Sequence, residues 1–483
     1  MMKKVITMIV LALLLIQVTA AGFASTVYEG STEEDKGSLV IVGGALEQSN
    51  GPVYERFVEL AKRKGPMKIG IIPAASTKPS KYGNLFKKDL VEVYGVPESA
   101  VVVLPIALRD DSTTDDIDES LWKENGSHPD VVASLADLTG IWFVGGDQTR
   151  ITEVLFTESG QATPALEAIT ALYRQGAVLG GTSAGAAIMS DVMLTGGDSL
   201  GALTSRQVGT YESMDDQESG ALTFEKGFGW FPGGIVDQHF DRKARLGRLI
   251  IANQLHKAAY PMGFGVDENT AMVYDAQTKT IESVGRGGVT IVDVTEAEET
   301  IVAGMRRLMN VRISFIEGYD QYSVETGEYK INPDKLDTVG YEYLYVPDPM
   351  VTGVMSRNGY YKQMLGFDLV DNEAADKVVS YAYGQNGVGY QLTFRQEEDT
   401  TGWWAYLDGM LDHYSALNVY LDLEPVVVTA APVAQATYTV QAGDVLWQIA
   451  RDHQVDMTSL IQANGLAHPD KIHIGQGLII PAK

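Results

Sequence analysis

Short apolar runs alternate with longer segments in which apolar residues recur at helical spacing over the first part of the chain. The runs are typical of buried strands, and the longer segments are typical of amphipathic helices. The predicted strands are 38–44, 67–73, 100–104, 138–146 and 177–179, and the predicted helices are 54–64, 84–94 and 163–175. This alternation favours an α/β fold, a mostly parallel sheet with helices on both faces. In such sheets the active site lies at the carboxyl ends of the strands.

The pattern changes twice in the second half of the chain. From about residue 291 it loosens, and residues 333–423, rich in Tyr, Gly and Asp, predict an extension of unknown role. Residues 424–436 combine Pro, Val, Ala and Thr and predict a linker. Residues 437–483 predict a compact terminal unit, in which two strand-like runs bracket two short amphipathic helices.

The first residues are typical of a secretory signal peptide. Two lysines precede a largely apolar run to Ala20, and small residues at 18–20 or 22–24 offer cleavage sites. We therefore expect 1–24 to be removed and the chain to be exported. The alternative is an uncleaved N-terminal anchor, because the run is close to the lower length limit for crossing a membrane.

The amino-acid composition excludes several kinds of site and partner. The chain has no cysteine, which excludes disulfides, thiolate nucleophiles and Cys-ligated zinc. Its net charge of −26 disfavours nucleic acid as a partner. The charge would suit a cationic substrate, although solubility alone explains it. A hydrophobic content of 45% over 483 residues provides a large core and predicts more than one domain.

The segment GTSAG at 181–185 fits the Gly-x-Ser-x-Gly pattern of a nucleophile elbow. An apolar strand precedes it and a helical start follows, which is the context that the pattern needs. Ser183 would then project from the sheet, and the N–H of Ala184, near a helix N-terminus, is suited to hold an oxyanion. The alternative is an ordinary glycine-rich turn between a strand and a helix.

A serine nucleophile needs a base, and His239 is the best candidate among seven histidines. It ends a strand-like run downstream of Ser183, whereas the others lie in the terminal unit, in a polar loop, in a helix or in the extension. A structural histidine is the alternative. A third group should orient the imidazole, and Asp237, Asp267 and Glu268 all remain candidates.

A basic cluster follows His239 directly. Within a helix, Arg245 and Arg248 would share one face at a spacing of three residues. Because guanidinium forks bind carboxylates, the cluster predicts a pocket for a substrate carboxylate. A solvated or salt-bridged helix face is the alternative.

Four segments, in this order, carry a family resemblance: 143–148, 181–186, 237–240 and 265–271. Together they resemble cyanophycinase, of the serine peptidase family that also contains aspartyl dipeptidases, over residues 37–332. The resemblance implies a class-I-glutamine-amidotransferase-like α/β/α sandwich. It also implies a catalytic apparatus without metal or cofactor, made of the nucleophile Ser183, the base His239, its partner Glu268 and the oxyanion donors Gly146 and Ala184.

The same resemblance implies a substrate pocket formed by Gln148, Asp237, Gln238, Lys243, Arg245 and Arg248. Cyanophycinases carry an arginine where this chain has Lys243. Lysine keeps the charge but loses the planar fork, so the departure bears on the substrate more than on the chemistry.

The terminal unit, residues 437–483, closely resembles a LysM module over its whole length. The resemblance implies a βααβ fold that binds N-acetylglucosamine chains, typically in peptidoglycan. A structural cap without a ligand is the alternative.

These observations predict a secreted, cell-wall-associated serine exopeptidase. Its expected substrate is cyanophycin, multi-L-arginyl-poly-L-aspartate, which it would cleave to β-Asp-Arg dipeptides. The alternatives are an isoaspartyl or aspartyl dipeptidase, a hydrolase of cell-wall peptides, and an inactive peptidoglycan-binding protein. The sequence leaves the oligomeric state open, and a homodimer is one option.

Overall fold

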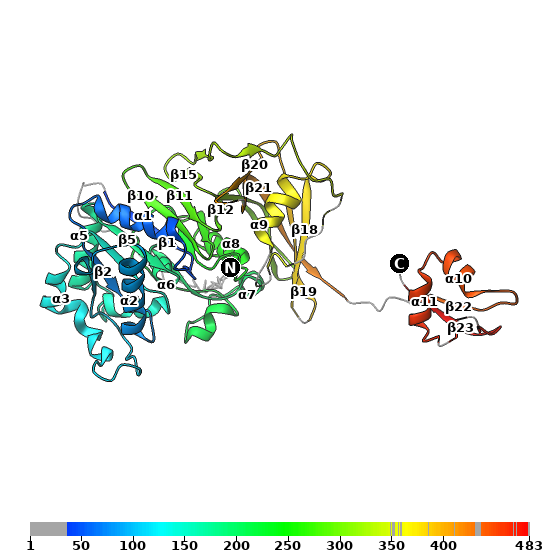
Figure 1. The fold of residues 1–483 in the computed structure, drawn as a ribbon, viewed down its shortest axis with the longest axis horizontal. Helices are drawn as coiled ribbons and strands as arrows, with labels where there is room; N and C mark the ends of the chain where they lie inside the picture. The colour runs from blue at the N-terminus through cyan, green and yellow to red at the C-terminus, as the bar shows by residue number, and fades with distance from the viewer. Residues whose placement is uncertain are drawn as a thin grey trace, which may run out of the picture.

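The computed structural model describes residues 36–347, 349, 353–355, 357, 360–384, 386–409, 411–429, 436–466, 468–469 and 471–481. The expected signal peptide at 1–24 lies outside these residues. Among the described helices, none combines the length and the apolar character that a membrane span requires. Figure 1 shows a large body and, at the red end of the colour scale, the small terminal unit.

The first sheet has nine strands in the order β16-β15-β11-β10-β1-β5-β4-β2-β3. Its parallel part consists of β1 (Ser38–Val42), β2 (Ile69–Ile72), β3 (Val101–Val103), β4 (Gly140–Phe143) and β5 (Val178–Thr182). These are the five predicted strands. The antiparallel part consists of β10 (Thr270–Asp275), β11 (Thr280–Gly285), β15 (Gln321–Ser323) and β16 (Tyr329–Lys330).

Helices cover both faces of the parallel part. One face packs against α1 (Gly51–Lys62) and α2 (Pro79–Lys88), and the other against α4 (Gln148–Leu155), α5 (Pro164–Arg174) and α6 (Ala184–Ala187). Both α1 and α2 begin earlier than predicted, because a proline in the first turn of each starts the helix. The predicted helix 84–94 continues after α2 as a π-helical turn, Asp89–Val93.

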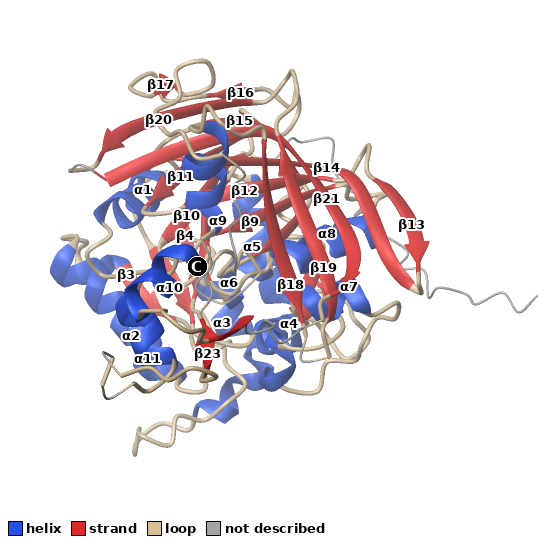
Figure 2. Cartoon of the chain, turned by 90° about the vertical axis from the view of Figure 1, so that its right-hand side faces the viewer, coloured by secondary structure: helices blue, strands red, loops and turns tan. Residues whose placement is uncertain are grey.

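The second sheet has ten strands and is almost entirely antiparallel. It contains β8 (Ile235–Asp237), β9 (Met262–Val266), β12 (Gly288–Asp293), β13 (Glu298–Val302), β14 (Met305–Glu317), β17 (Leu336–Asp337), β18 (Lys377–Tyr383), β19 (Val388–Arg395), β20 (Thr401–Leu407) and β21 (Leu411–Val427). Figure 2 shows β14, β18, β19 and β21 side by side. The sequence did not predict this sheet. Short turns join three of its antiparallel pairs, β13–β14, β18–β19 and β20–β21.

Residues 333–423 supply β17–β21 and so complete the second sheet. Leu421 of β21 and Phe394 of β19 are fully buried in one core with Leu249 of α8 (Leu246–Leu255). The extension therefore shares its core with the helix that follows His239. Strand β21 continues to Val427, inside the segment for which the sequence predicts a linker.

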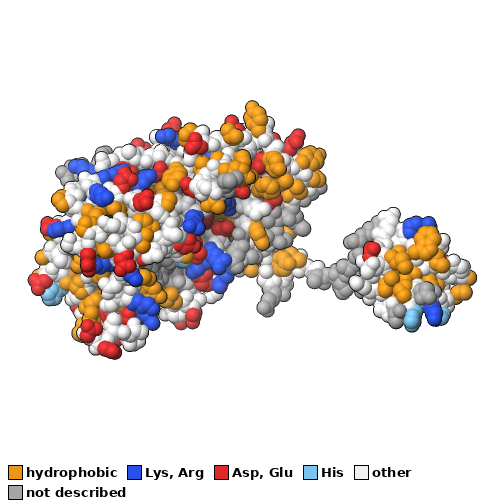
Figure 3. Space-filling view, in the orientation of Figure 1, with side chains coloured by type: hydrophobic (Ala, Val, Ile, Leu, Met, Phe, Trp, Pro, Cys, Tyr) orange, Lys and Arg blue, Asp and Glu red, His pale blue; other side chains and the backbone are white. Residues whose placement is uncertain are grey.

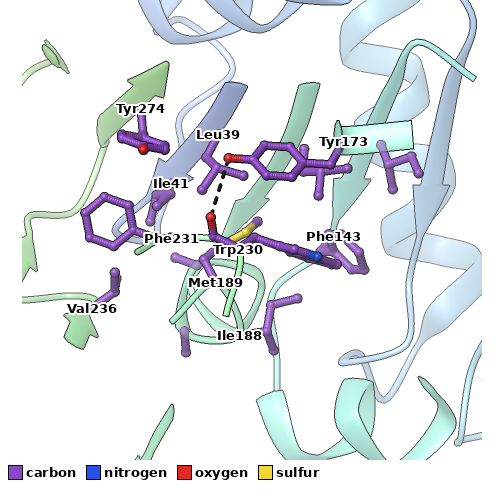
Figure 4. Packing of buried hydrophobic residues seen from close by; sticks show 14 of the residues in the cluster. Leu39, Ile41, Phe143, Tyr173, Ile188, Met189, Trp230, Phe231, Val236 and Tyr274 are labelled. Carbon is purple, nitrogen blue, oxygen red and sulfur yellow. Dashed lines mark hydrogen bonds between the residues drawn. The ribbon is translucent and has the colours of Figure 1, made fainter. Parts of the chain in front are cut away.

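The two sheets pack on each other through aromatic side chains. The ring of Phe231 lies edge-on to Phe264 of the second sheet and to Tyr274 of the first, with ring centroids 5.0 and 5.3 Å away. Figure 4 shows this part of the core, where Ile41 and Met189 also lie. The two sheets therefore share one core at this contact.

Short elements complete the body: α3 (Pro129–Ser134), β6 (Val192–Gly196), α7 (Ser199–Thr204), β7 (Thr223–Lys226) and α9 (Tyr361–Gln363). The terminal unit has the predicted βααβ order, with β22 (Ala436–Thr439), α10 (Leu446–Asp452), α11 (Met457–Ala463) and β23 (Gly477–Ile480). Its own small core includes Leu446, Leu460 and Leu478.

Candidate active site

Ser183 follows β5 in a strained turn. Its φ of 54° and ψ of −107° place a residue with a side chain in a sparsely populated region. The flanking glycines are required by close packing, since a Cβ on Gly181 would lie 2.5 Å from the Gly185 oxygen. A Cβ on Gly185 would lie 2.4 Å from the oxygen of Phe143. The turn therefore has the geometry of a nucleophile elbow.

His239 lies between Ser183 and Glu268 and contacts both. His239 follows β8, and its Nε2 lies 2.8 Å from the Ser183 hydroxyl oxygen. Its Nδ1 lies 2.5 Å from Oε1 of Glu268, in the turn that leads from β9 of the second sheet to β10 of the first. Gly44 allows the approach, because a Cβ there would lie 2.3 Å from the imidazole.

Of the three acids that the sequence left open, only Glu268 contacts the imidazole of His239. Asp237 accepts hydrogen bonds from Arg248 instead, at 2.6 and 2.7 Å. Asp267 accepts from the backbone N–H groups of Asp241 and Gly288, both at 3.1 Å. Ser183, His239 and Glu268 thus form one hydrogen-bonded series.

The surroundings keep the imidazole of His239 neutral. Burial, followed by the positive charges of Lys243, Arg245 and Arg248, lowers the pKa of His239 to about 2. A neutral imidazole that faces a serine hydroxyl is the form that accepts a proton. The Nδ1–H then points to Glu268, which fixes the tautomer.

The predicted oxyanion donors are the backbone N–H groups of Ala184, next to Ser183, and of Gly146, which lines the same cleft as Ser183. Ala184 is the first residue of α6, so its N–H has no acceptor within that helix. Gly146 has a φ of 147°, and a Cβ there would lie 2.2 Å from the oxygen of Ala75. Among the described residues, neither N–H has a hydrogen-bond acceptor.

A cleft of about 480 Å³ opens over Ser183 and His239. Gly146 lies in its wall, and its charged lining residues are Asp89 and Arg150. Asp89 accepts hydrogen bonds from Gln48 and from the hydroxyl of Tyr54, at 2.6 and 3.2 Å. Sequence reasoning missed both charged residues. Arg150 lies two positions after the segment 143–148, whereas Asp89 carries no signal of its own.

The basic cluster is buried and paired within the protein. Only 2% of the Arg248 side chain is exposed, and its guanidinium binds Asp237 in a bidentate pair. Arg245 donates to the Gln238 carbonyl at 2.6 Å and to Glu218 at 3.1 Å. Although burial opposes it, the charges of Arg248 and Arg245 hold the pKa of Asp237 below its ordinary value.

The remaining predicted pocket residues are also partnered, and none lines the cleft over Ser183. Lys243 donates to Glu218 at 2.5 Å. Gln148 is buried and donates to the Leu194 carbonyl at 2.9 Å. Gln238 is the exception, since its side-chain oxygen is buried without a partner in the described part of the chain. The cluster is therefore a salt-bridged framework directly behind His239.

Comparison with known proteins found relatives for both parts of the chain. A cyanophycinase from Synechococcus elongatus is 30% identical over 299 residues, which cover 60% of this chain and 80% of that protein. A cyanophycinase from Nostoc sp. is 34% identical over 270 residues, covering 55% and 76%. The LysM domain model matches residues 438–481.

Two solved structures cover about half of the chain. A peptidase from an acI-B1 actinobacterium has a TM-score of 0.38 at 21% identity and covers 54% of this chain and 91% of its own. A putative peptidase E from Listeria monocytogenes has a TM-score of 0.32 at 15% identity, with coverages of 52% and 100%.

The relatives define the chain as a hydrolase of the peptidase class. It belongs to the cyanophycinase family and carries a C-terminal LysM domain. The LysM domain indicates glycan binding and association with the cell wall or the extracellular space.

Proposed function

We propose that the chain is a secreted serine exopeptidase that hydrolyses cyanophycin to β-Asp-Arg dipeptides. The observation that supports it most is the series Ser183–His239–Glu268, with contacts of 2.8 and 2.5 Å, in which Ser183 and His239 line a cleft. The relatives that share 30–34% of their residues with this chain carry the name cyanophycinase.

In the proposed mechanism, the Ser183 hydroxyl attacks the carbonyl carbon while Nε2 of His239 takes its proton. Glu268 accepts a hydrogen bond from Nδ1–H and stabilises the imidazolium that forms. The N–H groups of Gly146 and Ala184 hold the oxyanion. The imidazolium gives its proton to the leaving amine, and the same histidine then activates the water that hydrolyses the acyl-enzyme.

The cleft offers both signs of charge to a substrate made of aspartate and arginine. Asp89 is suited to a guanidinium, and Arg150 to a carboxylate. A pocket role for Lys243 and Arg245 would require Glu218 to leave them, whereas Arg248 and Asp237 are suited to support the loop that carries His239.

A second candidate is the hydrolysis of isoaspartyl or wall peptides, which the LysM domain favours because it would hold the enzyme against peptidoglycan. Under either proposal the LysM domain anchors the peptidase at a cell wall outside the cell. A homodimer also remains a proposal.

The test is to incubate the purified protein with insoluble cyanophycin and, separately, with purified sacculi. We expect soluble β-Asp-Arg from cyanophycin, detected by mass spectrometry, and a loss of about 10⁴-fold or more in Ser183→Ala. Release of peptides from sacculi alone would favour the second candidate. Equal activity of Ser183→Ala and wild type would exclude the mechanism.

A further inference from the structure

A second cavity, of about 740 Å³, lies in the part of the body formed by residues 333–423. It shares no lining residue with the cleft over Ser183. Figure 3 has the orientation of Figure 1. In it, hydrophobic side chains gather at the upper right of the body, near β18 and β20. The proposed reaction makes no use of this region.

The floor of the cavity follows from strand periodicity. Successive side chains of a strand point to opposite faces, so Trp404 and Tyr406 of β20 share one face. Directly opposite on β21 are Tyr414, paired with Trp404, and Asp412, paired with Tyr406. The rings of Trp404 and Tyr406 meet edge to face, with centroids 4.7 Å apart. This face is aromatic, with a carboxylate at its end.

Exposed tyrosines stand at the rim. Tyr341 and Tyr343 at the rim are 81% and 86% exposed, and Tyr406 of the floor is 55% exposed. Single exposed apolar residues are ordinary, but a group of them around one cavity is typical of a binding site. The backbone N–H of Tyr343 donates to Asp371 at 2.7 Å, which fixes this rim to the floor.

The charged side chains that line the cavity all carry negative charge: Asp337, Asp371 and Asp412. Asp371 accepts hydrogen bonds from the backbone N–H of Tyr343 and, at 3.0 Å, from the hydroxyl of Tyr414. Asp412 accepts one hydrogen bond from the indole N–H of Trp404, at 2.9 Å. Asp337 is paired with Trp403 in the ladder, so its side chain lies on the opposite face of the sheet from Trp404. Of the three, Asp412 is therefore the carboxylate with a free oxygen for a ligand on the aromatic face.

We infer that this aromatic-acidic groove binds guanidinium groups, that is, the arginyl side chains of a polymer. A guanidinium is planar, weakly hydrated and stacks on aromatic faces, and its fork matches a carboxylate. A glycan would also stack on the rings, but its hydroxyls need donors as well as acceptors. The lining has no Asn, Gln, His, Lys or Arg, and the indole N–H of Trp404 already donates to Asp412, so outside the hydroxyls no side-chain donor of the lining is free for a glycan.

The groove continues toward the active-site loop. A neighbouring cavity of about 530 Å³ shares Phe367, Asp412 and Tyr414 with the first and reaches Asp241, two residues beyond His239. Its cation, Lys362, is held by Glu317 at 2.6 Å. The inference rests on the proposed function in naming the polymer as arginyl. One strand of cyanophycin would then be held in the groove while its end is processed.

The test uses the full chain with Ser183→Ala and follows binding by isothermal titration calorimetry, so that no cleavage is needed. The probes are a tetra-arginine peptide amide and its tetra-citrulline counterpart, which has the same shape without the charge. We expect tetra-citrulline to bind about tenfold or more weakly. Asp412→Asn and Tyr341→Ala/Tyr406→Ala should each weaken tetra-arginine binding about tenfold.

A matched control is Asp116→Asn, which removes the same charge from an exposed loop elsewhere and should leave the affinity unchanged. Wild-type affinity in both groove variants, or equal affinity for the two peptides, would overturn the inference. Chitotetraose binding that is lost in Tyr341→Ala/Tyr406→Ala would overturn it too, by making the groove a glycan site. Since binding is measured without hydrolysis, failure to cleave cyanophycin would reject the proposed function and leave this result standing.

Discussion

The two sheets contribute different parts of the candidate active site. The parallel sheet supplies Ser183 and both N–H groups, whereas the antiparallel sheet supplies His239. Glu268 lies in the turn that joins the two. The serine is thus positioned by a framework common to many α/β proteins, and its base by a sheet that residues 333–423 complete. The extension belongs to the support of the site even though its sequence carries no catalytic signal.

The largest expected effect concerns the turn that joins the sheets. In Glu268→Gln the imidazole loses the charged partner of Nδ1–H, so we expect kcat for cyanophycin to fall about 10²–10⁴-fold. Thermal unfolding should change little, because Glu268 is partly exposed. Undiminished kcat would mean that another group orients His239.

The dependence of the base on the extension can be tested with one buried leucine in each sheet. Leu179→Ala in β5 and Leu421→Ala in β21 should each lower the free energy of unfolding by about 2–5 kcal/mol. Because the extension shares its core with α8, we expect activity to be lost together with unfolding in both variants, as followed by calorimetry and residual hydrolysis. Suppose that Leu421→Ala shows an unfolding transition at a lower temperature than wild type but loses hydrolytic activity only at the temperature at which wild type does. The extension would then be an independent domain.

The pH profile tests the cations around the base. Because the pKa of His239 lies far below its ordinary 6.5, the acid limb of kcat/KM should fall well below pH 6.5. Lys243→Met removes a charge that lowers this pKa, so the pKa should rise and the limb should move to higher pH by about half a unit. Arg242→Met, an exposed neighbour, is the control and should leave the limb in place. A shift to lower pH in Lys243→Met would contradict the assignment.

The smallest expected effect concerns Glu218, whose carboxylate accepts hydrogen bonds from Lys243 and Arg245. If these cations receive a substrate carboxylate, Glu218→Gln should lower KM about two- to fivefold and leave kcat nearly unchanged. Asp215→Asn, an exposed acid of the same loop, serves as the comparison. A higher KM in Glu218→Gln would show instead that Glu218 holds the cations in place for binding.

The sequence predicted the parallel strands and the elbow at Ser183 because strands buried on both faces read as continuous apolar runs. It also predicted the terminal unit, whose pattern is local. The second sheet escaped prediction because several of its strands carry exposed aromatic residues, such as Tyr383 and Tyr406, and resemble loops when read alone.

The salt-bridge partners of the basic cluster could not be predicted from the sequence, for a different reason. The partner of Arg248 is Asp237, eleven positions earlier, and that of Arg245 and Lys243 is Glu218, in a separate loop. Whether a basic cluster is open or occupied depends on such tertiary contacts. The same holds for Asp89 and Arg150, which reach the cleft from different helices.

Strand β21 also has a mechanical consequence. It is the last strand of the body, it pairs with β14, β19 and β20, and the chain leaves its end at Val427 toward the LysM domain. If that domain grips a wall, a pull on it acts along β21 and loads its ladders with β19 and β14 in shear, where many hydrogen bonds must break together. A strand loaded in shear resists separation better than one whose hydrogen bonds break one after another. Tension between wall and enzyme would therefore distort the aromatic-acidic groove only after the ladders of β21 with β19 and β14 break.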